Sequence, residues 1–395
     1  MLFVRSLILN KNGLNKIRAR HKELKASDVD ESIKSIPPGE WCYLKPKDSE
    51  EKWLAFLNPL IDEKFSCIHI LQSIEILSVE DYISRQLKAA FEKRLQFNNY
   101  KDGCRLFYGA SDGLPGLIVD LFSNALITQI NTAGVDKFRN YIKIVLEEMT
   151  GKKNYFLDNK KYREKEFLPI FDSELLPDIE VLENTLRYKI RAEVIQKVGF
   201  YYDHRENRFQ LMSILKRLKK MPEIGVDLFC YTGAWGINAL SAGVSHCDFV
   251  DQGDFKPEVE LALKLNSFAD KGAFFRSDVF KFLDDSIAHH KKYDVILCDP
   301  PAFAKSHSQK DQALEGYSKL HRKVLRVASS GALIAFSSCT HYVDHVEFQK
   351  NILEASYKEN KKINLVYVGI QGWDHPITTL GDKSSYIKSY FYILE

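Results

Sequence analysis

The chain has 395 residues, of which 45% are hydrophobic, and carries a formal net charge of +3 at pH 7. This length predicts two or three domains with separate cores, and no stretch reaches the ~18–20 uncharged apolar residues of a membrane span. The seven cysteines include no CxxC pair, so we expect reduced thiols in a cytoplasmic protein, without a zinc site or a disulfide framework.

Residues 1–75 predict a small β-rich domain. Met1–Leu9 resembles a strand more than a signal peptide, because Arg5 interrupts its apolar run and no small-residue cleavage site follows. Short apolar runs between turn signals predict further strands at 41–44, 53–57 and 67–71. Basic residues cluster within positions 5–25, 152–165 and 216–220, which favours a polyanionic partner.

Residues 76–195 predict a second domain of the α+β type. The apolar spacing indicates a helix over 79–98 and another over 135–149. Alternating or continuous apolar runs indicate strands at 105–108, 117–122, 125–130 and 155–157, and we expect 186–190 to complete their sheet. Strands are not strictly interleaved with helices here, which is why we expect α+β rather than α/β.

From residue 196 to 395 strands and helices alternate. Strands are predicted at 225–229, 248–251, 273–277, 293–298, 331–337, 364–369 and 386–394. Helices are predicted at 207–220, 234–242, 256–269, 279–288, 316–328 and 345–360. This order predicts an α/β domain with a doubly wound, mostly parallel, Rossmann-like sheet that binds ligands at the carboxyl ends of its strands.

The segment Val226–Gly236 indicates the class of cofactor. An apolar run ends near Asp227, and a glycine-bearing turn leads into a helix, but the GxGxxG pattern of dinucleotide sites is absent. S-adenosylmethionine has no phosphate and needs acids for its amino group and ribose. Asp251 and Asp278 follow the next two strands. One such Asp alone is more often a cap or turn residue, but the three together predict an S-adenosylmethionine site.

The segment Asp299–Pro301 follows the fourth strand. The two prolines fix an extended exit and leave the Asp299 carboxylate facing the crevice. Methyltransferases that act on planar nitrogens use a similar Asp/Asn-Pro-Pro-aromatic segment, but here Ala302 separates the second proline from Phe303. The simpler interpretation of the segment is a rigid turn from strand to helix.

Cys339 lies directly after the fifth strand of this domain. A cysteine there is either a small buried hydrophobe or a nucleophile. Cytosine C5 is too weak a nucleophile to take a methyl group directly, but addition of a thiolate at C6 makes C5 enamine-like. A carboxyl group near N3 would stabilise the charge that builds on the ring.

The chain resembles the bacterial 23S ribosomal RNA cytosine-C5 methyltransferases of the large-subunit methyltransferase I type. The resemblance rests on Arg20-His21, Arg105–Gly116 with Asp120, Lys197–Arg208, Asp227–Gly233, Asp299–Pro301, Ser338-Cys339 and Asp374–Pro376. The chain departs from the family pattern in having Lys22-Glu23 in place of Pro-Trp, Val198 in place of Thr, and His204 in place of Gln.

The resemblance implies a PUA-like RNA-binding domain at 1–75, a central α+β domain at 76–195 and a methyltransferase domain at 196–395. It implies that Cys339 is the nucleophile and that Asp299 assists at the base, with no metal. The expected cofactor-binding residues are Tyr202, Asp203, Arg205, Asp227, Tyr231, Thr232, Gly233, Asp251, Asp278, Asp299 and Pro300.

The leading hypothesis is therefore an S-adenosylmethionine-dependent RNA cytosine-C5 methyltransferase. Its target base must leave the stack, so single-stranded or unfolded large-subunit rRNA is the expected partner. Two alternatives stay open: a methyltransferase of the same fold that acts on a base nitrogen such as that of guanine, with Cys339 merely packed, and an RNA-binding module without activity. The two N-terminal domains could serve a homodimer as easily as RNA.

Overall fold

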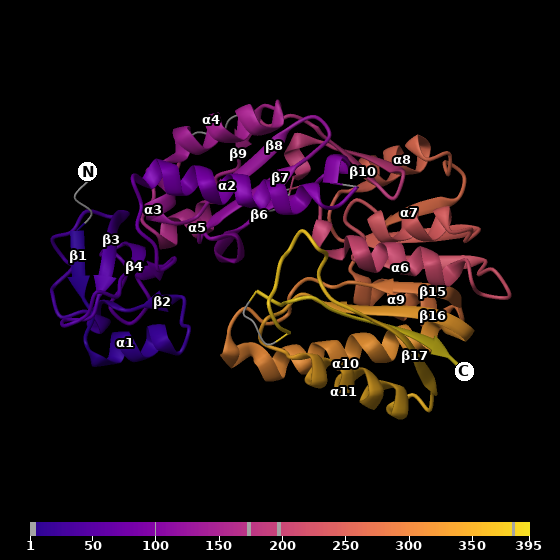
Figure 1. Cartoon of the computed structure of the whole chain (residues 1–395). Coiled ribbons are helices and arrows are strands. Elements are labelled where there is room, and N and C mark those ends of the chain that lie inside the picture. The colour runs from indigo at the N-terminus through magenta and orange to yellow at the C-terminus, as the bar shows by residue number, and fades with distance from the viewer. Residues whose placement is uncertain (1–4, 99, 172–174, 196–198, 381–383) are drawn as a thin grey trace. The chain divides into compact units, whose positions relative to one another are not determined.

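The computed structural model describes residues 5–98, 100–171, 175–195, 199–380 and 384–395. The chain forms two compact units (Figure 1). Unit 1 comprises Met1–Ile179 and Ile195–Gly199, and unit 2 comprises Glu180–Val194 and Phe200–Glu395. No helix in the described part of the chain has both the length and the hydropathy needed to cross a bilayer.

Unit 1 begins with a five-stranded sheet in the order β1-β3-β4-β5-β2. Its strands are β1 Arg5–Ile8, β2 Glu23–Leu24, β3 Glu40–Lys45, β4 Trp53–Leu57 and β5 Ile68–Ile70, and the helix α1 spans Lys11–Arg18. The predicted strands of this region are confirmed, although Met1–Val4 of the first lie outside the described residues. Helix α1 was not predicted, because it has only eight residues, most of them polar, and buries only Gly13 and Ile17.

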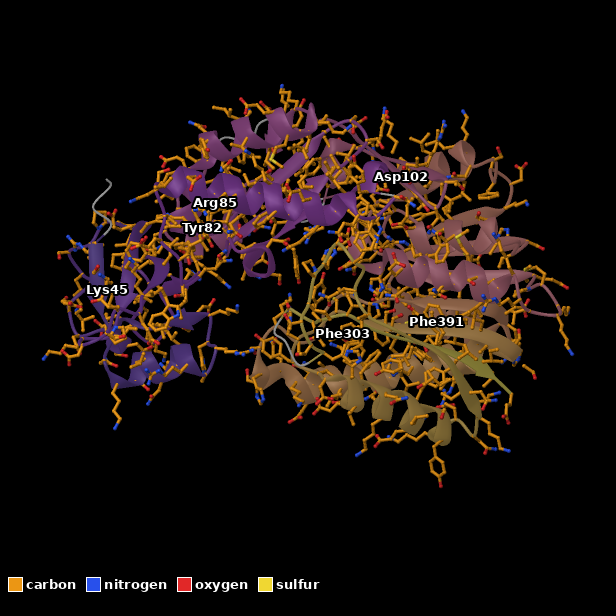
Figure 2. The ribbon with its side chains drawn as sticks, viewed as in Figure 1. Lys45, Tyr82, Arg85, Asp102, Phe303 and Phe391 are labelled. Atoms are coloured by element: carbon orange, nitrogen blue, oxygen red, sulfur yellow. The ribbon has the colours of Figure 1, made fainter. Side chains whose placement is uncertain are left out.

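The rest of unit 1 is a four-stranded sheet in the order β6-β7-β8-β9, with helices packed on it. The elements are α2 Val79–Leu95, β6 Cys104–Tyr108, β7 Leu117–Leu121, β8 Leu126–Ile130, α3 Ala133–Asp136, α4 Arg139–Thr150, β9 Asn154–Phe156 and α5 Lys160–Lys165. Figure 2 labels Tyr82 and Arg85 on α2, where Tyr82 is fully buried. The single helix predicted at 135–149 is two helices, because Phe138 leaves helical geometry.

Unit 2 opens with a hairpin of β10 Ile179–Glu183 and β11 Leu186–Ile190. The prediction that 186–190 completes the central sheet was wrong. The chain turns back at Asn184 and Thr185, which both have positive φ (52° and 68°), the geometry of a tight two-residue hairpin. The hairpin is tied to unit 2 by Asn266, whose side chain exchanges hydrogen bonds of 2.9 and 2.8 Å with the backbone of Arg187.

The main sheet of unit 2 has seven strands in the order β14-β13-β12-β15-β16-β18-β17. The strands are β12 Ile224–Leu228, β13 His246–Asp251, β14 Gly272–Arg276, β15 Tyr293–Cys298, β16 Ala328–Ser338, β17 Ile363–Gly369 and β18 Lys388–Leu394. The helices are α6 Arg205–Leu215, α7 Ala234–Ser241, α8 Lys256–Leu265, α9 Val279–Ala288, α10 Lys310–Val327 and α11 His345–Lys358. The predicted alternation of strands and helices is confirmed.

The strand order positions the site. Strands β12 to β16 run parallel, and β18 is inserted antiparallel between β16 and β17. The sheet grows outward from β12 in one direction through β13 and in the other through β15, so the topological switch lies between β12 and β15. Ligands of open α/β sheets bind at such a switch, outside the carboxyl ends of the strands. The described part of unit 2 therefore has its candidate site where β12, β13, β15 and β16 end.

Candidate cofactor and catalytic site

The turn between β12 and α7 has unusual backbone geometry. Phe229, Tyr231 and Gly233 have positive φ values of 60°, 48° and 81°, and such residues often cluster at functional sites. The Gly236 amide donates a hydrogen bond of 2.8 Å to Oδ2 of Asp227. A Cβ on Gly236 would lie 2.4 Å from the ring of Phe249. Glycine at this position therefore lets the start of α7 approach the sheet and hold the Asp227 carboxylate.

Asp227 is a buried acid with one carboxylate oxygen that no described residue hydrogen-bonds. Its side chain is fully buried, and Oδ1 has no hydrogen-bond partner among the described residues. Burial raises the pKa of Asp227 well above its usual range, and the charges of Asp299 and Asp251 raise it further. Buried polar atoms are usually paired. An unpaired carboxylate oxygen at this strand end is suited to accept a hydrogen bond from a cationic ligand group.

Asp251, at the end of β13, lies beside a group of aromatic rings. Its Oδ2 accepts from the Tyr231 amide at 3.1 Å and its Oδ1 from the Gly253 amide at 2.8 Å. The Tyr231 ring packs edge-on against Phe255 (4.8 Å between centroids) and Tyr201 (5.3 Å). A carboxylate held by backbone amides next to apolar rings suits a ribose whose attached base lies flat against apolar surface.

Of the remaining residues expected to bind the cofactor, Asp278 is exposed, whereas Thr232 and Pro300 are buried. Asp278 is exposed and caps α9, since its Oδ1 accepts from the Lys281 amide at 3.0 Å. The structure thus supports the cap interpretation for this residue, as for most aspartates at strand ends. Thr232 and Pro300 are buried in the loops after β12 and β15.

Tyr202 and Asp203 lie in the turn Tyr202–His204 that leads into α6, and Arg205 begins that helix. Arg205 is almost fully buried and pairs with Asp374 (Nη1–Oδ2 3.2 Å). Its guanidinium also lies 5.1 Å from the Tyr202 ring centroid. The Tyr386 hydroxyl donates to Oδ2 of Asp203 at 2.7 Å. The structure therefore brings together two segments that carry the family resemblance; of the first, Lys197 and Val198 lie outside the described residues.

Asp299 is held by two aromatic side chains. The Trp235 indole donates to Oδ2 at 3.1 Å, and Nε2 of His204 lies 3.4 Å from Oδ1. Burial lowers the pKa of His204, but the Asp299 carboxylate more than offsets this, so the pKa of His204 is raised. On its other side, Nδ1 of His204 lies 3.1 Å from the Asn207 amide nitrogen. That amide nitrogen also donates to the Ile370 carbonyl at 3.0 Å. Because an amide nitrogen only donates, Nδ1 of His204 must accept from it. This contact favours a neutral His204 ring with its proton on Nε2.

Sequence reasoning missed the roles of His204 and Trp235. His204 stood out only as a departure from the family pattern, and Trp235 only as a residue of the cofactor turn. Their rings pack at 5.3 Å between centroids, and both contact an acid that follows a different strand. Nothing in the local sequence indicates that His204 and Trp235 lie together at Asp299. The one available signal is that His204 departs from a segment that otherwise matches the family.

Cys339 differs from the other cysteines of the chain. It is half-buried, whereas the other six are buried. Residues on either side of it are anchored: Ser338 shares a 2.9 Å hydrogen bond with the Tyr317 hydroxyl, and Thr340 donates to the Ala304 carbonyl at 3.1 Å. The carbonyl of Thr340 also accepts from the Lys388 ammonium at 2.6 Å. The thiol therefore lies at an anchored strand end with some access to solvent.

Phe303 is the aromatic residue that follows the two prolines after β15. Its ring stacks on Tyr317 of α10 with 4.6 Å between centroids and 27° between planes, and it packs against the core of unit 2 (Figure 2). The aromatic residue after Pro300 and Pro301 is thus engaged with the core on one face. Among the described residues, no group of three or more His, Cys, Asp or Glu side chains is arranged to hold a metal ion.

Known proteins resemble this chain in sequence and in fold. A family model described as "Conserved hypothetical protein 95" matches residues 205–347. "Ribosomal RNA large subunit methyltransferase I" of Pseudoalteromonas atlantica is 30% identical over 293 residues, which are 72% of this chain and 73% of the relative. The protein of that name from Photobacterium profundum is 26% identical over 401 residues, covering 98% of each chain.

Solved structures share the fold over the full length. A methyltransferase-type chain solved in complex with SAH superposes with a TM-score of 0.79 at 18% identity, covering 99% of this chain and all of that one. A Streptococcus mutans protein described as SAM-dependent gives 0.76 at 18% identity, covering 99% of this chain. The predicted Rossmann-like fold, with its preceding β-rich and mixed sheets, is thereby confirmed. The sequence matches, which span most of both chains, show that this chain belongs to the ribosomal RNA large subunit methyltransferase I family.

Proposed function

We propose that this protein methylates C5 of a cytosine in large-subunit ribosomal RNA through a covalent bond between Cys339 and C6. As a member of its family the chain is a methyltransferase that uses S-adenosylmethionine. The relatives are named for large-subunit rRNA, and we extend that substrate to this chain. The observation that carries the cytosine assignment is the half-buried thiol of Cys339 at the end of β16, next to the strand that Asp299 follows.

Cys339 and Asp299 have separate roles in the proposed reaction. The thiolate of Cys339 adds to C6 of the extruded cytosine, which makes C5 a carbon nucleophile. S-adenosylmethionine supplies a methyl group activated by a sulfonium centre. C5 takes that methyl group while the electrons of the S–CH₃ bond return to sulfur. The C5 proton then leaves to solvent, its bonding electrons form the C5=C6 double bond, and the C6–S bond breaks to regenerate the thiolate. Asp299 faces the base and stabilises charge on its ring.

The same crevice would hold the cofactor. We assign the open Oδ1 of Asp227 to the cofactor's amino group and the backbone-held carboxylate of Asp251 to its ribose. Tyr231, with its neighbouring rings, would border the adenine. The other residues proposed to line or shape this site are Tyr202, Asp203, Arg205, Thr232, Gly233, Asp278, Asp299 and Pro300. Family membership and the strand-end geometry both support this assignment.

We assign RNA binding to unit 1. The proposed domains are a PUA-like domain at 1–75, a central domain at 76–195, and a methyltransferase domain at 196–395. Glu180–Val194 of the central domain belong to unit 2. Helix α1 carries basic residues in its last turn at Lys16, which pairs with Asp28, and at Arg18, which pairs with the exposed Glu51. A cavity of about 180 Å³ in this unit is lined by polar and basic side chains that include Lys22, Gln86 and Lys93. Both features suit phosphate and base edges of single-stranded RNA. Homodimerisation stays a prediction.

The test uses RNA that contains 5-fluorocytosine. Fluorine at C5 cannot leave as a proton does, so a Cys339 nucleophile traps the RNA as a covalent adduct. We expect the adduct with wild-type protein and with the control Cys42→Ala, which removes a buried thiol of unit 1, and no adduct with Cys339→Ala. Methyl transfer at the wild-type rate by Cys339→Ala would refute the thiol mechanism. Methylation of a guanine nitrogen, or RNA binding without methyl transfer, would establish one of the two alternatives.

A further inference from the structure

Lys388 is a buried cation that the proposed reaction does not yet use. It lies at the start of β18, directly opposite Ser338, the residue before Cys339. Its side chain is 3% exposed. The ammonium donates to the Thr340 carbonyl at 2.6 Å and to the Tyr386 carbonyl at 2.9 Å. A charged amine removed from water is costly unless it has partners, so its retention here requires an explanation.

The partners of this amine are unusual for a buried lysine. No carboxylate in the described part of the chain forms an ion pair with Lys388; its hydrogen-bond partners are two backbone carbonyls. Burial lowers the pKa of Lys388 to about 8, and the charges of Cys339 and then Asp344 act in the opposite direction. With a pKa of about 8, the amine is roughly nine-tenths protonated at pH 7. The side chain is thus a cation under ordinary conditions.

Electrostatic coupling between two titrating groups is mutual. If a negative Cys339 favours the protonated form of Lys388, then a protonated Lys388 favours the thiolate of Cys339 to the same extent. The ammonium also anchors the carbonyl of the residue after Cys339, while β16–β18 pairing holds the residue before it. Lys388 therefore acts on Cys339 in two ways: it anchors the neighbouring backbone, and its charge favours the thiolate.

The other titratable groups around this pair come from α10, α11 and the loops that contain His341 and Tyr386. His345, at the start of α11, has its pKa lowered by burial and by the charge of Lys388, so it stays neutral. Asp344 caps the same helix. The pKa of Tyr317, from α10, is raised by burial, so it also stays neutral. The His341 and Tyr386 rings pack together at 5.3 Å between centroids. Apart from the thiol itself, Asp344 is the one anion in this set.

We infer that Lys388 is a positioning residue of the methyl transfer: it fixes the backbone that carries Cys339 and places a buried positive charge that favours the thiolate. This inference rests on the proposed function, in which Cys339 is the nucleophile. A thiol with an ordinary pKa of ~8.5 is only a few per cent thiolate at pH 7. A neighbouring cation raises that fraction before any RNA is bound, without a base that must first accept the proton.

The test measures how alkylation of Cys339 by iodoacetamide depends on pH, in the absence of RNA and cofactor. Mass spectrometry of the peptide that contains Cys339 separates it from the six buried cysteines. We expect the wild-type rate to reach half its maximum below the ordinary thiol pKa of ~8.5. Lys388→Met keeps the length of the side chain but removes the charge. It should move the midpoint upward and slow alkylation at pH 7 on the order of tenfold.

The control is Lys362→Met, which removes an exposed charge just before β17 and should leave the profile unchanged. Identical profiles for wild type and Lys388→Met would overturn the inference. If Lys388→Met does not fold, the wild-type profile decides alone: a midpoint at or above about 8.5 overturns the inference and a lower one supports it. Methyl transfer by Cys339→Ala would instead refute the proposed function, so the two failures are distinguishable.

Discussion

Gly236→Ala tests whether the turn after β12 is built for close approach of α7 to the sheet. The new Cβ would lie 2.4 Å from Cε1 of Phe249 and 2.9 Å from Sγ of Cys247, so the helix must shift. Overpacking costs about 1–3 kcal/mol, and weakening the amide bond to the buried Asp227 adds about 1–3 kcal/mol. The higher helix propensity of alanine offsets about 1 kcal/mol. The net loss of unfolding free energy should be about 1–5 kcal/mol.

The matched control for Gly236→Ala is Gly225→Ala on β12. There the nearest atom to a new Cβ is 3.5 Å away, which is ordinary van der Waals contact. Differential scanning calorimetry should show the transition of unit 2 lowered by roughly 2–20 °C for Gly236→Ala, with little change for Gly225→Ala. Titration calorimetry with S-adenosylhomocysteine should show affinity reduced on the order of tenfold for Gly236→Ala. Equal stability and affinity in both variants would refute the steric argument.

Two further substitutions test Asp227 and His204, the histidine that contacts Asp299. The raised pKa of Asp227 means that folding is opposed as pH rises from the unfolded pKa of ~3.9 towards the folded value. Asp227→Asn should therefore gain stability relative to wild type between pH 4 and 8 in denaturant titrations, yet bind S-adenosylhomocysteine more weakly; a pH-independent difference would contradict this. For His204, burial lowers the pKa, but Asp299 more than offsets this and the pKa is raised. Its protonated ring therefore adds stability that is present at low pH and lost as pH rises through the folded pKa. His204→Gln should cost more unfolding free energy at pH 5.5 than at pH 8.5, and an equal cost would mean that Asn207 keeps the ring neutral.

The sequence predicted the fold best where burial follows a simple period. Strands β4 and β15 and helix α9 lie where their apolar patterns placed them, at Trp53–Leu57, Tyr293–Cys298 and Val279–Ala288. Strand β11 was assigned to the wrong sheet and β10 was not predicted, because the turn between them is Asn184-Thr185 rather than an Asn-Gly pair. Two adjacent residues with positive φ, neither of them glycine, leave no readable signal in the sequence.

The candidate site was predictable only as far as each side chain follows its own strand. Asp227, Asp251 and Asp299 could be placed because parallel strands of one sheet end at the same edge. The contacts that give these groups their chemistry join distant elements: Trp235 and Asp299 are 64 residues apart, and Thr340 and Lys388 are 48 apart. The apolar periodicity of a sequence does not indicate contacts between residues so far apart in the chain.

A weaker signal for Lys388 was nevertheless present in the chain. Residues 386–394 were predicted as a strand, and a lysine in a strand whose other residues, apart from Ser389, are apolar or aromatic violates the expected pattern. If β18 were an edge strand, that lysine would merely be solvated. It lies between β16 and β17 instead, so the charge is buried and must be compensated within the protein. Such violations concentrate at functional sites. A buried lysine paired in register with the residue before a strand-end cysteine is therefore better explained by thiolate chemistry than by packing.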